Sequence, residues 1–340
     1  ALDASDAWQM GQVNVAKLEL LAAKAITADY TQKAWRSKDE IDTGSALPLT
    51  DCYVAPCVSA CAIHQDIPEY IRLVSEGRYA DALDVIYRTN ALPAITGHIC
   101  DHQCQYNCTR LDYEGPLNIR DLKKIALEKG WDEYRRRWHK PAGTGSRNAV
   151  AVIGMGPAGL AAGYFLARAG HAVTLFDREQ AAGGVPRHVI PRFRSPGELV
   201  QHDINFVAEH GVKFVYGCDP QLSVDKLKAQ GFEYVLVGIG TDKNSGIQLD
   251  GDNRNLYKSL PFLRRFNDGE KLALGRHVAV VGAGNTAMDC CRSAKRLGGK
   301  DVKVIVRSGF EEMKASPWEK EDAVHEGIPI LNFHVPVAFE

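Results

Sequence analysis

Residues 150–178 read VAVIGMGPAGLAAGYFLARAGHAVTLFDR, and this stretch decides the fold. Its pattern predicts a strand over 149–153, a glycine-rich turn, a helix that ends near 169 and a second strand over 171–176. The glycines of the turn follow G-x-G-x-x-G spacing between a strand and a helix, which is the context that a dinucleotide-binding fingerprint requires. The alternative is an incidental glycine-rich turn.

Each glycine of this first turn has a physical role. Gly154 permits the tight turn, Gly156 lets the backbone approach a pyrophosphate, and Gly159 lets the helix pack closely on the strand. The helix N-terminus favours an anion because its free N–H groups and its dipole point there. An acid directly after the second strand is placed to accept hydrogen bonds from an adenosine ribose. The predicted contacts of this site are Gly154, Gly156, Pro157, Ala158, Gly159, Asp177 and Arg178.

The bulk composition is that of an ordinary globular protein. The chain has 340 residues, 45% of them hydrophobic and 24% charged, which suggests two or three domains. A net charge of −1 argues against nucleic-acid binding, and no apolar run approaches the length of about 18 residues that spans a membrane. The first residues, ALDASDAWQM, lack a secretory signal, so we expect a cytoplasmic protein. Because there is no initiator Met, we also expect a fragment of a longer chain.

Cysteines are concentrated in one part of the chain. Six of the nine lie between 52 and 108, in two triplets with three or four residues between neighbours. In a chain without an export signal, clustered cysteines indicate metal ligands before disulfides. Two matched triplets favour iron–sulfur clusters, which need several thiolates. Zinc, or structural cysteines without a metal, are the alternatives. The candidate ligands are Cys52, Cys57, Cys61, Cys100, Cys104 and Cys108, whereas Cys290 and Cys291 suit a helix core.

Two further segments follow the first turn and are candidates to touch a cofactor. Gly183 and Gly184 precede the cationic loop IPRFR, which includes Arg194. A Gly-Gly turn with a cationic loop suits a planar ring system and its phosphates. The run YVLVGIG over 234–240 predicts a strand whose end, at Gly240 and Thr241, meets a cofactor through its backbone.

The strand–turn–helix–strand pattern then repeats at 277–308, HVAVVGAGNTAMDCCRSAKRLGGKDVKVIVRS. Two such folds imply two nucleotides. The position that Asp177 holds in the first copy is Arg307 in the second, followed by Ser308. An acid there repels a 2′-phosphate, whereas an arginine pairs with it, so the second site is predicted to prefer NADP(H) over NAD(H). Its candidate contacts are Gly282, Gly284, Asn285, Thr286, Arg307 and Ser308.

These motifs together resemble a known family. The cysteine triplets, GMGPAGLAAGYFLARAG, GG…IPRFR, VGAGNTAMD and VRSGFEEMKA are similar to those of the small subunit of NADPH-dependent glutamate synthase and of dihydropyrimidine dehydrogenase. The stretch from LTDCYVAPC to NCTRLDY resembles the selenate reductase iron–sulfur subunit within that family. The resemblance covers about residues 45–335 and implies an α-helical ferredoxin-like 4Fe–4S domain followed by α/β Rossmann-like FAD- and NAD(P)-binding domains.

The resemblance also implies the domain bounds and the cluster ligands. We expect an iron–sulfur domain over 1–140, an FAD domain over 147–270 and an incomplete NADP(H) domain over 271–340, inserted in the FAD domain. One cluster would take Cys52, Cys57 and Cys108, and the other Cys61, Cys100 and Cys104. Two positions depart from the family: Leu49 replaces a cysteine, and Lys123 stands at the non-cysteine ligand position. Asp51, Asp101, His98 and His102 are candidate substitutes.

The predicted function is an electron-transfer module. NADPH at the second fold would reduce FAD at the first, and the flavin would pass electrons to up to two 4Fe–4S clusters and on to a missing or separate substrate-reducing domain or subunit. We predict no nucleic-acid or membrane partner. The alternative is a nucleotide-binding scaffold or sensor whose cysteines hold zinc or nothing.

Overall fold

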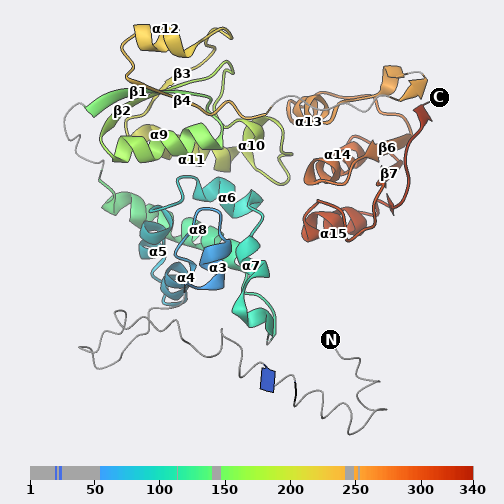
Figure 1. The fold of residues 1–340 in the computed structure, drawn as a ribbon, viewed down its shortest axis with the longest axis horizontal. Coiled ribbons are helices and arrows are strands. Elements are labelled where there is room, and N and C mark those ends of the chain that lie inside the picture. Colours follow the sequence, from blue (N-terminus) through green and yellow to red (C-terminus); the bar gives the residue numbers. More distant parts are fainter. Residues whose placement is uncertain are drawn as a thin grey trace. The chain divides into compact units, whose positions relative to one another are not determined.

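The computed structural model describes residues 20, 23, 24, 54–112, 114–139, 147–241, 249–251 and 253–339 (Figure 1). The chain divides into two compact units, 1–54 and 55–340. Within the first unit, Leu20, Ala23 and Lys24 are helical. The other residues before 54 in the α-helical domain predicted over 1–140 lie outside the described residues, and Cys52 is among them.

The second unit begins with short helices. They are α3 Pro56–Ala60, α4 Ile67–Ser75, α5 Tyr79–Ile86, α6 Pro93–Ile99, α7 Gln103–Tyr106, the 3₁₀ turn Thr109–Asp112 and α8 Ile119–Arg137. Helix α4 begins where the Asp66 carboxylate accepts a hydrogen bond from the Glu69 N–H at 3.3 Å, which caps the helix. Helix α8 packs against α5 at Gly130, where a Cβ atom would lie 2.6 Å from the Tyr79 carbonyl carbon. A glycine is therefore needed at this contact.

The first sheet has four parallel strands in the order β3-β2-β1-β4: Lys213–Val215, His171–Phe176, Arg147–Ile153 and Tyr234–Val237. Figure 1 shows α9 Pro157–Arg168 and α11 Gly197–Glu209 on one face of this sheet and α12 Val224–Ala229 on the other. The short helix α10 Val185–His188 follows the Gly-Gly turn. The two strands predicted around the first turn are confirmed, whereas β4 ends at Val237 and not at Gly240.

The helices before residue 140 and the first sheet share one hydrophobic core. The ring of Phe206, on α11, lies 4.9 Å from Tyr87 and 6.1 Å from Tyr134 of the helical region. The carboxylate of Asp203, also on α11, is fully buried and accepts hydrogen bonds from the Ala94 N–H at 3.2 Å and the Ile95 N–H at 2.8 Å. These donors are the otherwise unsatisfied N–H groups of α6. The boundary predicted near residue 140 thus separates two segments that pack as one body.

The second sheet has three parallel strands in the order β6-β7-β8: His277–Val281, Asp301–Ile305 and Ile330–Leu331. Around it lie α13 Ser259–Asn267, α14 Asn285–Arg296 and α15 Pro317–His325, with a separate core. A short ladder joins β5 Asp250–Gly251 to β9 Ala338–Phe339, and a 3₁₀ turn spans Asn253–Asn255.

Helix α13 belongs with this second core, because Phe262 and Leu263 are buried in it against α14. Its Asn267 also donates a hydrogen bond to the Ile190 oxygen at 2.9 Å, so α13 contacts the loop after the Gly-Gly turn as well. The domain bounds expected from sequence, with a boundary at 270, stay a prediction.

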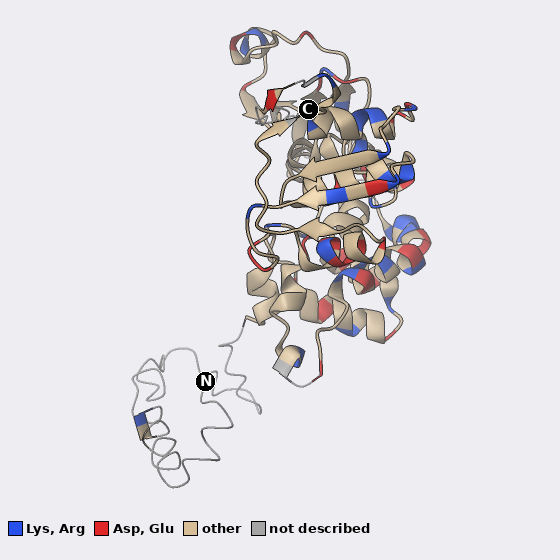
Figure 2. Cartoon of the chain, turned by 90° about the vertical axis from the view of Figure 1, so that its right-hand side faces the viewer, with Lys and Arg blue, Asp and Glu red and all other residues tan. Residues whose placement is uncertain are grey.

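Charged residues of both signs are interleaved along the same helices, as Figure 2 shows for one face. Among the described residues, no helix is both long enough and apolar enough to cross a membrane.

Candidate dinucleotide and thiol sites

The first glycine turn leaves no room for side chains. Gly154 has a φ of +107°, and a Cβ atom on it would lie 2.3 Å from the Gly238 carbonyl oxygen. A Cβ atom on Gly159 would lie 1.9 Å from the Gly154 oxygen. At Gly156 the nearest atom would be 3.9 Å away, so this glycine is not required by packing. Because Gly156 has no side chain, the N-terminus of α9 is open to the approach of a ligand.

Asp177 lies over this turn, directly after β2. Its Oδ2 accepts a hydrogen bond from the Met155 N–H at 2.6 Å, and its Oδ1 accepts one from the Glu179 N–H at 3.0 Å. The carboxylate is therefore oriented by the backbone of the turn that it would serve. Each carboxylate oxygen can accept more than one hydrogen bond, so capacity for ribose hydroxyls is left. Pro157 and Ala158 form the first turn of α9, and Arg178 follows Asp177 with its Nε 3.8 Å from Glu179 Oε1.

The Gly-Gly turn packs on the first glycine turn. Gly184 has a φ of +56°, and a Cβ atom on it would lie 2.7 Å from the Gly156 Cα, while Gly183 donates its N–H to the Met155 oxygen at 2.8 Å. The structure thus brings 154–159 and 183–184 together. Gly240, with a φ of +67°, and Thr241 are exposed beyond the end of β4.

Arg194 has other partners than a cofactor in this structure. Its Nη1 lies 2.7 and 2.8 Å from the two oxygens of Asp289 on α14, and its Nη2 pairs with Glu319 on α15. Burial raises the pKa of the Asp289 carboxyl, and Arg194 opposes this. Burial likewise raises the pKa of Glu319, again against Arg194. Arg292 extends the network, with Nη1 3.4 Å from Glu319. The arginine therefore ties the loop after the Gly-Gly turn to the second core.

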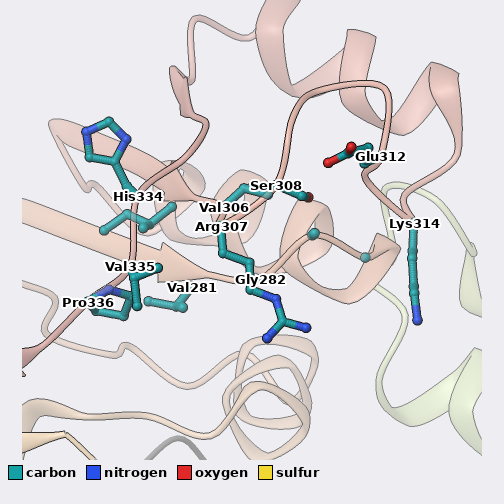
Figure 3. A pocket seen from close by; sticks show the side chains of 13 residues that line it. Val281, Gly282, Val306, Arg307, Ser308, Glu312, Lys314, His334, Val335 and Pro336 are labelled. Atoms are coloured by element: carbon teal, nitrogen blue, oxygen red, sulfur yellow. The ribbon is translucent and has the colours of Figure 1, made fainter.

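The second glycine turn opens on a pocket with a volume of about 570 Å³. Figure 3 shows the Arg307 guanidinium beside Gly282, with the Lys314 ammonium pointing in the same direction from across the pocket. Both side chains are exposed, and within the described ranges neither has an ion-pair or hydrogen-bond partner. Gly284, Ser308 and the loop of His334, Val335 and Pro336 also line it, as does Glu312, whose carboxylate accepts a hydrogen bond from the Gly309 N–H at 3.0 Å. The pocket therefore has the charge and size to accept an anionic nucleotide.

Asn285 and Thr286 begin α14 at the edge of this pocket. Asn285 holds Ser316, whose N–H donates to Asn285 Oδ1 at 2.7 Å and whose Oγ accepts from Asn285 Nδ2 at 3.2 Å. Thr286 is exposed. Cys290 and Cys291, further along α14, are buried, as predicted for core residues.

The described thiols gather around α3 and α7, which pack against each other. Burial raises the pKa of Cys57, and the nearby Cys108 and Cys61 thiols add to this. Burial also raises the pKa of Cys104 to about 11, with added effects of Cys100 and Cys61. Cys57, Cys61, Cys100, Cys104 and Cys108 are all free of disulfides. Cys61 thus neighbours both Cys57 and Cys104, and the division into two ligand sets that the family resemblance implies stays a prediction.

Over 54–112 and the other described ranges, no three His, Cys, Asp or Glu side chains come close enough to hold a metal ion. By donor type, however, the free thiols fit an iron–sulfur cluster. The described residues do not supply the full set of ligands, since Cys52 lies outside them.

Lys123 and the nearby histidines have specific contacts. Lys123 is buried, with Nζ 3.1 Å from Thr96 Oγ1 and 3.9 Å from Cys100 Sγ. His98, a candidate substitute ligand, and His64 each hydrogen-bond to a backbone oxygen. His102 stacks on aromatic rings, and burial followed by the charge of Arg120 lowers its pKa to about 4.

The lining residues that sequence reasoning missed include two basic ones, Lys314 and His334. Lys314 lies in a motif used only for the resemblance, and His334 lies in a loop without a pattern of its own. The loop backbone is fixed by hydrogen bonds from the Phe333 N–H to the Ser308 oxygen at 3.4 Å and from the His334 N–H to the Val306 oxygen at 3.0 Å. A cation a few residues after Arg307 was the available signal.

Comparisons with known families cover most of the chain. Residues 31–134 match the family of dihydropyrimidine dehydrogenase domain II, 4Fe-4S cluster, and residues 148–339 match the pyridine nucleotide-disulphide oxidoreductase family.

Curated relatives match this chain over different shares of their own lengths. "Putative oxidoreductase YgfK" of Escherichia coli (strain K12) is 65% identical over the whole of this chain, which spans 33% of that protein. "NADPH-Fe(3+) oxidoreductase subunit beta" of Geobacter sulfurreducens is 34% identical over 82% of this chain and 42% of that one. "Glutamate synthase [NADPH] small chain" of Azospirillum brasilense is 33% identical over 92% of this chain and 68% of that one.

Proposed function

Since the chain belongs to the pyridine nucleotide-disulphide oxidoreductase family, with a 4Fe–4S domain ahead of that region, we propose that it draws electrons from NADPH and delivers them through FAD and iron–sulfur clusters to a separate catalytic domain or subunit. The cofactors supply the chemistry, hydride transfer by nicotinamide and flavin and single-electron transfer by the clusters. The protein binds them, orients them and sets their surroundings.

The second glycine turn is the proposed NADPH site. The observation that carries this assignment is the Arg307 guanidinium just after β7, which lines the pocket of about 570 Å³ and has no partner among the described residues. A 2′-phosphate paired with Arg307, and with Lys314 across the pocket, would satisfy both cations, and an NADH ribose would leave both without a partner. Gly282, Gly284, Asn285 and Thr286 would meet the pyrophosphate at the N-terminus of α14, and Ser308 would lie beside Arg307.

The first glycine turn is the proposed FAD site. Gly154, Gly156, Pro157, Ala158 and Gly159 would receive the pyrophosphate at the N-terminus of α9, and Asp177 would accept the ribose hydroxyls. Gly183 and Gly184 border the same turn, while Arg178, Gly240 and Thr241 would lie along the remainder of the cofactor. Arg194 is proposed to orient the loop that borders the site, through Asp289 and Glu319.

The two cysteine triplets are the proposed cluster ligands, with Cys52, Cys57 and Cys108 in one set and Cys61, Cys100 and Cys104 in the other. Free thiols suit a cytoplasmic location, where thiols stay reduced, and we propose that location for the module.

The electron acceptor would lie outside this chain. The chain spans a third of the length of the first relatives that it matches, which leaves room in such proteins for a substrate-reducing region. The narrower resemblance to the selenate reductase iron–sulfur subunit supplies no chemical argument for selenate as that acceptor. Nucleic acid and membranes are not proposed as partners.

An anaerobic cofactor inventory tests the proposal. The purified protein should be yellow-brown, contain flavin, iron and sulfide, and lose its flavin absorbance on addition of NADPH. A colourless protein that contains only zinc would instead support the alternative, a nucleotide-binding scaffold or sensor. A flavoprotein that is bleached equally by NADH and NADPH would remove the argument from the 2′-phosphate.

A further inference from the structure

A contact between α15 and α7 joins the two proposed ends of the electron path. The indole of Trp318 lies with its centroid 3.7 Å from the His102 ring and 5.9 Å from the Tyr106 ring. The Arg120 guanidinium lies 5.8 Å from the centroid of the same indole. Trp318 of α15 therefore packs among side chains of α7 and α8, in the region that carries the thiols. Helix α15 itself belongs to the core of the second sheet.

A hydrogen-bond chain runs beside this stack. Ser316 Oγ donates to Asp101 Oδ1 at 3.3 Å, and the same oxygen accepts from Asn285 Nδ2. Asn285 directly follows Gly284, which lines the pocket. Three polar side chains thus connect the N-terminus of α14 to the loop between Cys100 and Cys104.

On the thiol side, the contact uses a strained residue. His102 has a φ of +33°, a left-handed conformation that costs energy for a residue with a Cβ atom. Such a conformation persists only when its surroundings determine it, and the surroundings here are the rings of Trp318 and Tyr106. Asp101 and His102 both lie between Cys100 and Cys104. Iron bound to these two thiols would therefore restrict the motion of Asp101 and His102 from both sides.

We propose that this contact couples the two sites, so that loading of the thiols with iron and sulfide tightens NADP(H) binding at the second glycine turn. Fixing Cys100 and Cys104 removes conformational freedom from Asp101 and His102. His102, on which Trp318 stacks, and Asp101, which accepts from Ser316, are then ordered before the nucleotide binds. Ordering Asn285 for the nucleotide therefore costs less conformational entropy. By linkage, bound NADP(H) stabilises the loaded thiol site by the same factor. Trp318 and Ser316 are positioning residues in this scheme, which rests on the proposed function.

The test compares NADP⁺ binding by calorimetry in iron-loaded and iron-free protein, both with flavin. We expect the loaded form to bind at least about fivefold more tightly, the lower end of typical couplings between sites. Trp318→Leu and Ser316→Ala should each reduce this ratio towards one. Val324→Ala, an exposed position on the same helix, should retain it. The spectrum of the reduced clusters should also shift with NADP⁺ in the parent protein and not in Trp318→Leu.

Equal affinities in the loaded and iron-free parent protein would overturn the coupling. So would a ratio that survives both substitutions. If Trp318→Leu does not fold, Ser316→Ala decides, because it removes one oxygen without opening a cavity. A protein that binds no NADP⁺ in either state would contradict the proposed NADPH site instead, so the two failures are distinguishable.

Discussion

The two glycine turns differ in the charge of the side chain near the end of their second strand. In the first it is Asp177, whose two oxygens accept hydrogen bonds from the Met155 N–H in the turn and from the Glu179 N–H. In the second it is Arg307, which has no partner among the described residues and lines a pocket. One βαβ unit thus provides a preoriented acceptor and the other a cation open to a ligand. We propose that this position, together with Lys314 in the second unit, decides between ribose hydroxyls and a 2′-phosphate.

The two βαβ units also differ in how they are attached to the rest of the molecule. The first sheet shares its core with the helical region, whereas the second sheet has its own core. The second is tied back by side chains, chiefly Arg194 with Asp289 and Glu319, and Trp318 with His102. Apolar burial is non-directional, and ion pairs and ring stacks fix a geometry. The first attachment therefore gives stability, and the second gives orientation.

The largest expected effect separates the turns by their third glycine position. Gly159→Ala should strongly destabilise the first sheet and α9, because its Cβ atom would lie 1.9 Å from the Gly154 oxygen. The second turn already carries Ala287 at that position. Urea unfolding followed by circular dichroism measures the loss, which should exceed about 3 kcal/mol. Gly197→Ala, with open space around its Cβ position, is the control and should be nearly neutral.

Removing the arginine of the second attachment should have the next largest effect. Arg194→Ala leaves Asp289 and Glu319 without their cation in a buried site and should cost about 3–5 kcal/mol. Burial already raises the pKa of both carboxyls, so the folded variant binds protons that the unfolded chain releases. Its stability should then fall as the pH rises from about 4 through the raised pKa values. The deficit relative to the parent should be larger at pH 8 than at pH 5.

Thermal unfolding at both pH values measures this deficit. Arg187→Ala removes an arginine that donates a hydrogen bond to Gln201 on α11. It should show no comparable dependence of stability on pH. A deficit for Arg194→Ala that is constant over the range would contradict the assignment of buried carboxyls.

A smaller effect should come from the shared core. Asp203→Asn keeps the shape of the side chain but replaces one acceptor oxygen by an amide that cannot accept from α6, at a cost of about 1–3 kcal/mol. Burial raises the pKa of Asp203, so the parent gains stability relative to the variant as the pH falls through that raised value. Measured unfolding should show the helical region and first sheet losing stability together. Separate transitions in the parent would break the description as one core.

The smallest expected effect concerns ligand choice alone. Arg307→Ala should weaken NADPH binding about tenfold, or about 1.4 kcal/mol, and leave NADH binding nearly unchanged. Calorimetry with each nucleotide measures the pair of constants. Lys314→Ala should act in the same direction by a smaller factor, because a lysine is a point charge and not a bidentate donor. Equal losses for the two nucleotides would show that Arg307 does not contact a 2′-phosphate.

Local features of the fold were predictable from sequence and distant contacts were not. Strand β2 was predicted with its bounds, and the end of α9 to within a residue, because glycine spacing and apolar periodicity are local signals. The Arg194 loop was predicted to border a cofactor, and its ion pairs with acids on α14 and α15 were not foreseen. The packing of α13 against α14 was not foreseen for the same reason. Pairings between residues far apart in sequence leave no periodic trace, and one sequence cannot show them.

The buried carboxylate of Asp203 also limits how such proteins recombine. A fusion that joined the helical region to a foreign nucleotide-binding sheet at residue 140 would leave the start of α6 uncapped and the rings of Tyr87 and Tyr134 without Phe206. A transplant that succeeds must therefore carry α11 along, although that helix comes after the recombination point. In engineering terms the exchangeable piece is a set of contacting helices that is discontinuous in the chain.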